Sequence, residues 1–218
     1  MRKVKKFKLT SEFIVDISGV KLFRIKALIE FGNVKAGDLG GYIEKEENLS
    51  HMGDAWVSDD ARISGNAQVF GDAQVFGDAQ VFGDAWVFGN ARVFGDAWVF
   101  GNARVSGNAQ VFGNARVFGN AWVSGNARVF GDAQVSGNAR VSGNARVSGD
   151  AQVFGDARVS GDKDYAYAHG FGSCNRTTTF FRLKDGDVGV RCGCFYGTLR
   201  GGCERSAGTG KRNGKKGI

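Results

Sequence analysis

Only two histidines, His51 and His169, offer a side chain suited to general acid–base chemistry near neutral pH. A repetitive stretch from Gly53 to Ser160 separates them, and it contains no His, Cys or Lys. Both histidines therefore lie just outside the repeats, where we expect terminal caps. We interpret both as cap residues and keep them as the candidates for catalysis.

The four cysteines, Cys174, Cys192, Cys194 and Cys203, all fall in the last quarter of the chain. Cys-x-Cys places both thiols on one face of a strand, and no Cys-x-x-Cys pair accompanies it, so no metal site is predicted. Free thiols without a disulfide framework favour a reducing cytoplasm. The many Asp residues of the repeats are interpreted as turn formers, because their regularity argues against a unique acid–base pair.

The repeats follow one six-residue unit, Gly-Asp/Asn-Ala-x-Val-Phe/Ser, which occurs 18 times without insertion. Only Asp59, in place of Gly, and Ile63, in place of Val, depart from it. A six-residue period is typical of a hexapeptide β-helix. Strand alternation places Ala and Val inside and x outside, while Gly and Asp/Asn form the corner. The sequence predicts an all-β, single-stranded parallel β-helix of about six triangular 18-residue coils.

The outward positions must carry any function, and residues 18 apart are expected to stack in columns. Position x holds 8 Arg, 6 Gln and 4 Trp, and the position after Val holds 10 Phe and 8 Ser. Arg104 is expected between Trp86 and Trp122, which suits cation–π stacking. The candidate binding or assembly face comprises Phe76, Phe94, Phe112, Phe130, Phe82, Phe100, Phe118, Trp86, Arg104 and Trp122.

Three interpretations of these columns stay open. They can be ladders that only stabilise the parallel sheets. They can form an aromatic surface for self-association or for a protein partner. They can form a platform for nucleic acid, with bases on the aromatic rings and phosphates on Arg. The 11 acidic residues of 51–162 argue against nucleic acid.

Four segments are expected: an N-terminal β cap (1–52), the β-helix (53–162), a C-terminal β-hairpin cap (163–199) and a basic disordered tail (200–218). Residues 6–9 and 13–15 are predicted to form a first strand pair, and the C-terminal hairpin is predicted to turn at 184–187. The net charges of 1–50, 51–162 and 163–218 are +3, −3 and +7. The sequence contains no apolar run of the ~20 residues that a membrane span needs.

The inward Val, the small Ala two residues before it and the Gly-Asp/Asn corner resemble the left-handed parallel β-helix of hexapeptide-repeat proteins, the trimeric LpxA-like superfamily. The leader is similar to that of uncharacterised and acyltransferase-like hexapeptide proteins of bacteria and their prophages. The similarity extends to about Leu199. Its motifs in the leader are Gly19-Val20-x-Leu22-x-Arg24-Ile25, Phe31-Gly32-x-Val34-Lys35 and Gly37-Asp38-x-Gly40-Gly41-Tyr42.

This resemblance implies left-handed winding and a homo-oligomer, with a trimer favoured. It also implies an alternative activity, an acyl-CoA-dependent acyltransferase with a His base between subunits. Because the repeats lack His and inserted loops, we favour a non-catalytic structural or binding scaffold. No cofactor is expected unless the acyltransferase alternative holds, in which case acetyl-CoA or another acyl-CoA binds. The protein partner is unknown.

Overall fold

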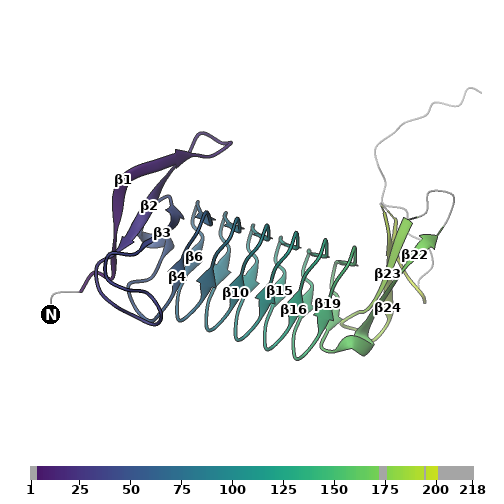
Figure 1. The fold of residues 1–218 in the computed structure, drawn as a ribbon. Coiled ribbons are helices and arrows are strands. Elements are labelled where there is room, and N and C mark those ends of the chain that lie inside the picture. Colours follow the sequence, from purple (N-terminus) through teal and green to yellow (C-terminus); the bar gives the residue numbers. More distant parts are fainter. Residues whose placement is uncertain (1–3, 172–175, 194, 201–218) are drawn as a thin grey trace, which may run out of the picture.

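The computed structural model describes residues 4–171, 176–193 and 195–200, and it shows a row of coils with a β cap at each end (Figure 1). Each hexad contributes one two-residue strand formed by x and Val (or Ile63). Strands 18 residues apart pair in parallel, so the 18 strands form three columns of six. The predicted parallel β-solenoid is confirmed, and left-handed winding stays a prediction.

The three columns are the three faces of the solenoid. The first face consists of β4 (Trp56–Val57), β7 (Gln74–Val75), β10 (Arg92–Val93), β13 (Gln110–Val111), β16 (Arg128–Val129) and β19 (Arg146–Val147). The second face consists of β5 (Arg62–Ile63), β8 (Gln80–Val81), β11 (Trp98–Val99), β14 (Arg116–Val117), β17 (Gln134–Val135) and β20 (Gln152–Val153). The third face consists of β6 (Gln68–Val69), β9 (Trp86–Val87), β12 (Arg104–Val105), β15 (Trp122–Val123), β18 (Arg140–Val141) and β21 (Arg158–Val159).

The interior of the solenoid is made of the Ala and Val (or Ile) of every hexad, each at most 1% exposed. This confirms the inward assignment, which follows from strand alternation. At the corners the repeat glycines adopt positive φ, for example +68° at Gly95. Asp59 is the one non-glycine with positive φ among the described residues (+56°), and its carboxylate accepts a hydrogen bond from the Gly77 N–H at 3.0 Å. That bond helps to hold an Asp in a conformation that glycine adopts more easily.

The N-terminal cap consists of β1 (Phe7–Val15), β2 (Lys21–Ala27), β3 (Leu39–Ile43) and the 3-10 turn η1 (Glu46–Asn48). β1 pairs antiparallel with β2, and an irregularity lies between Leu9 and Phe13. The expected pairing of 6–9 with 13–15 is wrong, because the chain passes through a bulge rather than a turn and both pieces lie on one strand. β3 pairs in parallel with β5, so the cap extends the sheet of the second face.

The carbonyl groups at the open N-terminal end of the solenoid bond to side-chain donors. Lys6 is only 1% exposed, and its Nζ donates to the carbonyl oxygens of Gly53 at 3.1 Å and Ala55 at 2.7 Å. The equally buried Asn48 donates from Nδ2 to two carbonyl oxygens of the third hexad, at 3.1 and 2.8 Å. These side-chain donors take the place of the backbone N–H groups that a preceding coil would supply to the first coil.

At the C-terminal end the chemistry is reversed, because N–H groups of the last coil face outward and need acceptors. Side-chain oxygens of the cap supply them. The pairs are Arg146 N with Asp162 Oδ1 (3.1 Å), Gln152 N with Thr179 Oγ1 (2.9 Å) and Ser160 N with Asp164 Oδ2 (2.8 Å). The caps therefore satisfy backbone groups of opposite kind.

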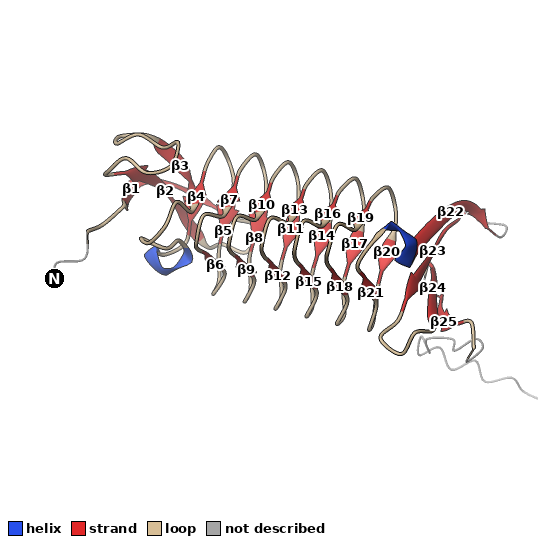
Figure 2. Cartoon of the chain, turned by 90° about the horizontal axis from the view of Figure 1, so that it is seen from below, coloured by secondary structure: helices blue, strands red, loops and turns tan. Residues whose placement is uncertain are grey.

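The C-terminal cap is a four-stranded antiparallel sheet that stands beyond the last coil (Figure 2). The predicted hairpin is its central pair, β23 and β24. Its elements are η2 (Asp162–Asp164), β22 (Tyr165–Phe171), β23 (Arg176–Arg182), β24 (Val188–Cys192) and β25 (Phe195–Thr198). Cys192 is half-buried, whereas Cys174, Cys194, Cys203 and the predicted disordered segment 201–218 lie outside the described residues.

Candidate interaction surface

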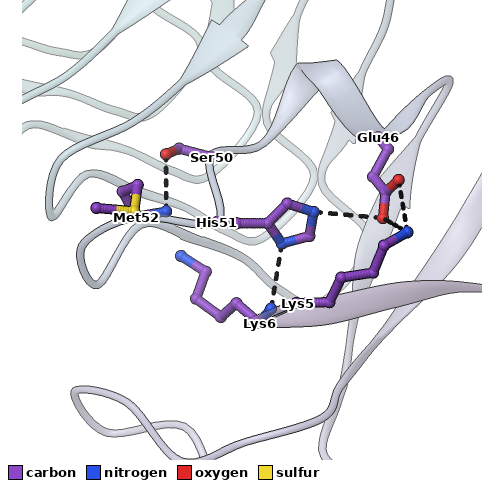
Figure 3. A network of polar contacts seen from close by, with 6 residues as sticks. All are labelled: Lys5, Lys6, Glu46, Ser50, His51 and Met52. Atoms are coloured by element: carbon purple, nitrogen blue, oxygen red, sulfur yellow. Dashed lines mark hydrogen bonds and ion pairs between the residues drawn. The ribbon is translucent and has the colours of Figure 1, made fainter. Parts of the chain in front are cut away.

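His51, the first catalytic candidate, lies within a polar network of the N-terminal cap (Figure 3). Its Nδ1 accepts a hydrogen bond from the Lys6 backbone N–H at 3.2 Å, and its Nε2 lies 3.3 Å from Glu46 Oε1. The imidazole also stacks on Phe7, with ring centroids 4.4 Å apart. The hydrogen bond from Lys5 holds the pKa of Glu46 below its usual range. Since both ring nitrogens have protein partners, the geometry supports a structural role for this histidine.

His169, the second candidate, lies on β22 in the opposite cap and is exposed. Its Nδ1 lies 2.8 Å from Thr177 Oγ1 and 3.9 Å from Asp150 Oδ2. The whole solenoid separates it from His51 (Figure 1). The structure therefore does not bring the two histidines together in one site within a single chain.

The phenylalanine columns form stacks with nearly parallel rings. In the Phe76, Phe94, Phe112 and Phe130 ladder, successive centroids are 4.8 to 5.0 Å apart, with interplanar angles of 1 to 3°. The second ladder, Phe82, Phe100 and Phe118, has the same geometry. All seven side chains are half-buried, because each ring stacks on a ring of a neighbouring coil. Part of each ring remains exposed to solvent.

The predicted ten-residue surface is divided between two faces. The first ladder follows strands of the first face, and the second follows strands of the second face, so both border the second face. We call this region, the second face with its two bordering Phe ladders, the aromatic face. Trp86, Arg104 and Trp122 instead lie on the third face.

Arginines stack on tryptophans of the preceding coil. Arg104 lies in the ladder between Trp86 and Trp122, as predicted, and its guanidinium is 4.9 Å from the Trp86 ring centroid. Trp122 instead carries the guanidinium of Arg140 at 5.5 Å and donates from Nε1 to Ser106 Oγ at 3.0 Å. A further pair, Arg116 on Trp98 at 5.1 Å, lies on the aromatic face. The 18-residue spacing predicts that Trp98 and Arg116 are neighbours in one column, but only the structure shows that their side chains stack.

The aromatic face contains a shallow groove and is acidic. The groove has a volume of about 520 Å³. It is lined by Asp78, Gln80, Asp96, Trp98, Asn114, Arg116 and Asp132. The hexads of the second face carry six carboxylates (Asp59, Asp60, Asp78, Asp96, Asp132 and Asp150) against two arginines (Arg62 and Arg116). The net charge of −4 disfavours the phosphate backbone of nucleic acid.

Other site types have little support in the described part of the chain. Within it, no group of three or more His, Cys, Asp or Glu side chains is placed to hold a metal ion. None of its helices has both the length and the apolar character needed to cross a membrane.

Together these features define a β-solenoid repeat protein with stacked aromatic and arginine side chains on its outer faces. The family described as YdcK beta solenoid repeat matches residues 109–125, 121–137 and 133–149. These windows start 12 residues apart, which is two hexads, so the match follows the same repeat that forms the coils. A search of curated proteins found no similar sequence.

Proposed function

We propose that this protein is a non-catalytic scaffold that self-associates through its aromatic face, with a trimer as the expected assembly. The observation that carries the proposal is the pair of Phe ladders that border one groove. Seven rings offer their edges along successive coils. Burial of apolar area and of aromatic edges is what stabilises protein interfaces.

The contacts of His51 support a scaffold over an acyltransferase. His51 is engaged by cap residues on both ring nitrogens, and the described repeats offer no other imidazole. An acyltransferase of the kind that the resemblance implies requires a free general base. Calorimetry with acetyl-CoA tests that alternative directly, and micromolar affinity would reverse our preference.

Light scattering coupled to size exclusion tests self-association. The chain itself provides mild substitutions, because Ser replaces Phe at the equivalent position of eight hexads. We expect the variant Phe94→Ser/Phe100→Ser/Phe112→Ser to reduce the assembly to the 23.3 kDa monomer while remaining folded. The control, Phe13→Ser, removes an exposed ring of the N-terminal cap and is expected to assemble normally. A monomeric wild-type chain at high concentration would refute the proposal.

A further inference from the structure

The charges of the solenoid are separated onto opposite sides. The hexads of the second face have a net charge of −4, as described above. We call the edge where the third face turns into the first face the basic edge. The arginines on its two sides are Arg92, Arg128 and Arg146 on the first face and Arg104, Arg140 and Arg158 on the third face.

The corner of the basic edge lacks acidic residues over most of its length. From the third coil onward its turn positions hold Asn90, Asn108, Asn126 and Asn144, whereas nine of the 18 hexads hold Asp at this position. Amide hydrogen bonds of 3.1 Å connect Asn108 to Asn126 and Asn126 to Asn144. The basic edge therefore presents guanidinium groups beside a neutral, ordered corner.

The basic edge and the aromatic face also differ in the size of their side chains. From the third coil onward the basic edge has small residues, Ser106, Ser124 and Ser142, whereas a single stacked pair, Phe70 and Phe88, occupies its first two coils. In a three-sided prism, the edge shared by two faces lies opposite the third face. The slim basic edge and the broad acidic face bordered by phenylalanines therefore point in opposite directions.

Most of these charges are not neutralised by an ion pair within the described part of the chain. In the part of the molecule that the structure describes, none of the six arginines forms an ion pair, and neither do Asp60, Asp78, Asp96 or Asp132. Asp60, Asp78 and Asp96 occupy the same position on successive coils, whose stacked rings are 4.8 to 5.0 Å apart. Like charges stacked directly on neighbouring strands are destabilising unless a partner neutralises them.

We infer that the basic edge of one copy docks on the acidic aromatic face of a second copy, between its two Phe ladders. This inference rests on the proposed self-association and names its two surfaces. The surfaces are complementary in charge, and both repeat with the same coil spacing, so arginines of one copy reach carboxylates of the other along several coils. Because the two surfaces differ, the contact is heterologous and forms a ring wherever the rotation closes.

Charge-swapped variants test the docking. Each substitution introduces a residue type that occurs at the same position of another hexad. The acidic-face variant is Asp78→Asn/Asp96→Asn/Asp132→Asn/Gln80→Arg/Gln134→Arg. The basic-edge variant is Arg128→Gln/Arg146→Gln/Asn126→Asp/Asn144→Asp. The control variant, Glu30→Gln/Glu47→Gln, removes acidic charge from the N-terminal cap only. Circular dichroism and thermal melting establish that all are folded.

We expect each swapped variant alone to self-associate roughly tenfold or more weakly than wild type, because the attraction between its two docking surfaces is weakened in the basic-edge variant and reversed in the acidic-face variant. An equimolar mixture of the two variants restores one docking contact and forms a heterodimer, because the unaltered basic edge of one variant docks on the unaltered acidic face of the other. The control variant assembles like wild type, and added salt weakens wild-type assembly. Wild-type assembly with unaffected variants, or with a mixture that stays monomeric, would overturn the docking but leave self-association intact. A monomeric wild type would refute self-association as well.

Discussion

The ammonium group of Lys6 donates a hydrogen bond of 2.7 Å to the carbonyl oxygen of Ala55, at the point where the first coil has no preceding coil. A second bond of 3.1 Å reaches the Gly53 carbonyl oxygen. The Phe31 ring lies beneath the same ammonium, 4.6 Å away at its centroid. A single lysine side chain thus supplies the donors that a strand would supply elsewhere in the stack.

Replacing Lys6 by Met should destabilise the protein, because it removes both hydrogen bonds of the ammonium group. The variant keeps most of the apolar volume but leaves two buried carbonyl groups without their donors. We expect a loss of about 1–3 kcal/mol in the free energy of unfolding, measured in urea. Lys8→Met, at an exposed position two residues later on β1, is the control and should change little. Equal stability of both variants would contradict the capping role.

Burial lowers the pKa of Lys6 to about 8 from 10.5, although the nearby Asp54 and Asp72 partly oppose the change. The folded chain therefore releases this proton at lower pH than the unfolded chain. Stability should rise with pH between about 8 and 10.5, and the unfavourable contribution is complete below that window. The neutral amine still has two N–H groups for its two carbonyl partners.

The measurement is the difference in unfolding free energy between wild type and Lys6→Met across that pH window. The difference cancels the titration of other groups and should increase in favour of wild type as pH rises. A flat difference would show that the folded and unfolded chains hold this proton equally.

Asn48→Asp should be more damaging than its small change in shape suggests. The side-chain amide donates to two carbonyl oxygens and is 1% exposed, so a carboxylate would face them without any donor. We expect a loss of at least about 2 kcal/mol in unfolding free energy. Asn90→Asp is the matched control, because Asp occupies that exposed repeat position in many hexads. A similar melting temperature for both variants would argue against Asn48 as a cap.

Val105→Asp should unfold the array. Val105 is fully buried in the middle of the third face, and an unpaired carboxylate there costs several kcal/mol. Arg104→Gln, one residue earlier but outward-facing, should lose no more than about 1 kcal/mol, the contribution of its cation–π contact with Trp86. Far-UV circular dichroism during thermal melting distinguishes the two, and a wild-type melt for Val105→Asp would contradict the inward packing.

The two histidines should differ in their effect on stability. His51→Ala removes two polar contacts and the stacking on Phe7, so we expect a loss of about 1 kcal/mol and a fall in Tm of about 2–4 °C. His169→Ala removes an exposed side chain and should leave Tm nearly unchanged. The reverse order, measured by differential scanning calorimetry, would require another account of the N-terminal cap.

The sequence by itself determined the solenoid, because each hexad encodes the same local rule. Ala and Val turn inward by strand alternation, and Gly bends the chain at each corner with positive φ. Three such sides bring residues 18 apart into register, so even the pairing of Val75 with Val93 follows from counting. The columns of the candidate surface followed from the same arithmetic.

Only the tertiary structure decided how the array ends and how its surface contacts are formed. Lys6 meets Ala55 across 49 positions, and no periodicity connects them. The N-terminal strand continues through a bulge where the sequence suggested a turn, because pairing with β2 favours one long strand. Arg104 stacks on Trp86 of the preceding coil, whereas Trp122 of the next coil carries Arg140 and donates a hydrogen bond to Ser106. The hexad pattern determines how neighbouring coils pair. The caps depend instead on contacts between segments far apart in the sequence, and these contacts exist only in the folded chain.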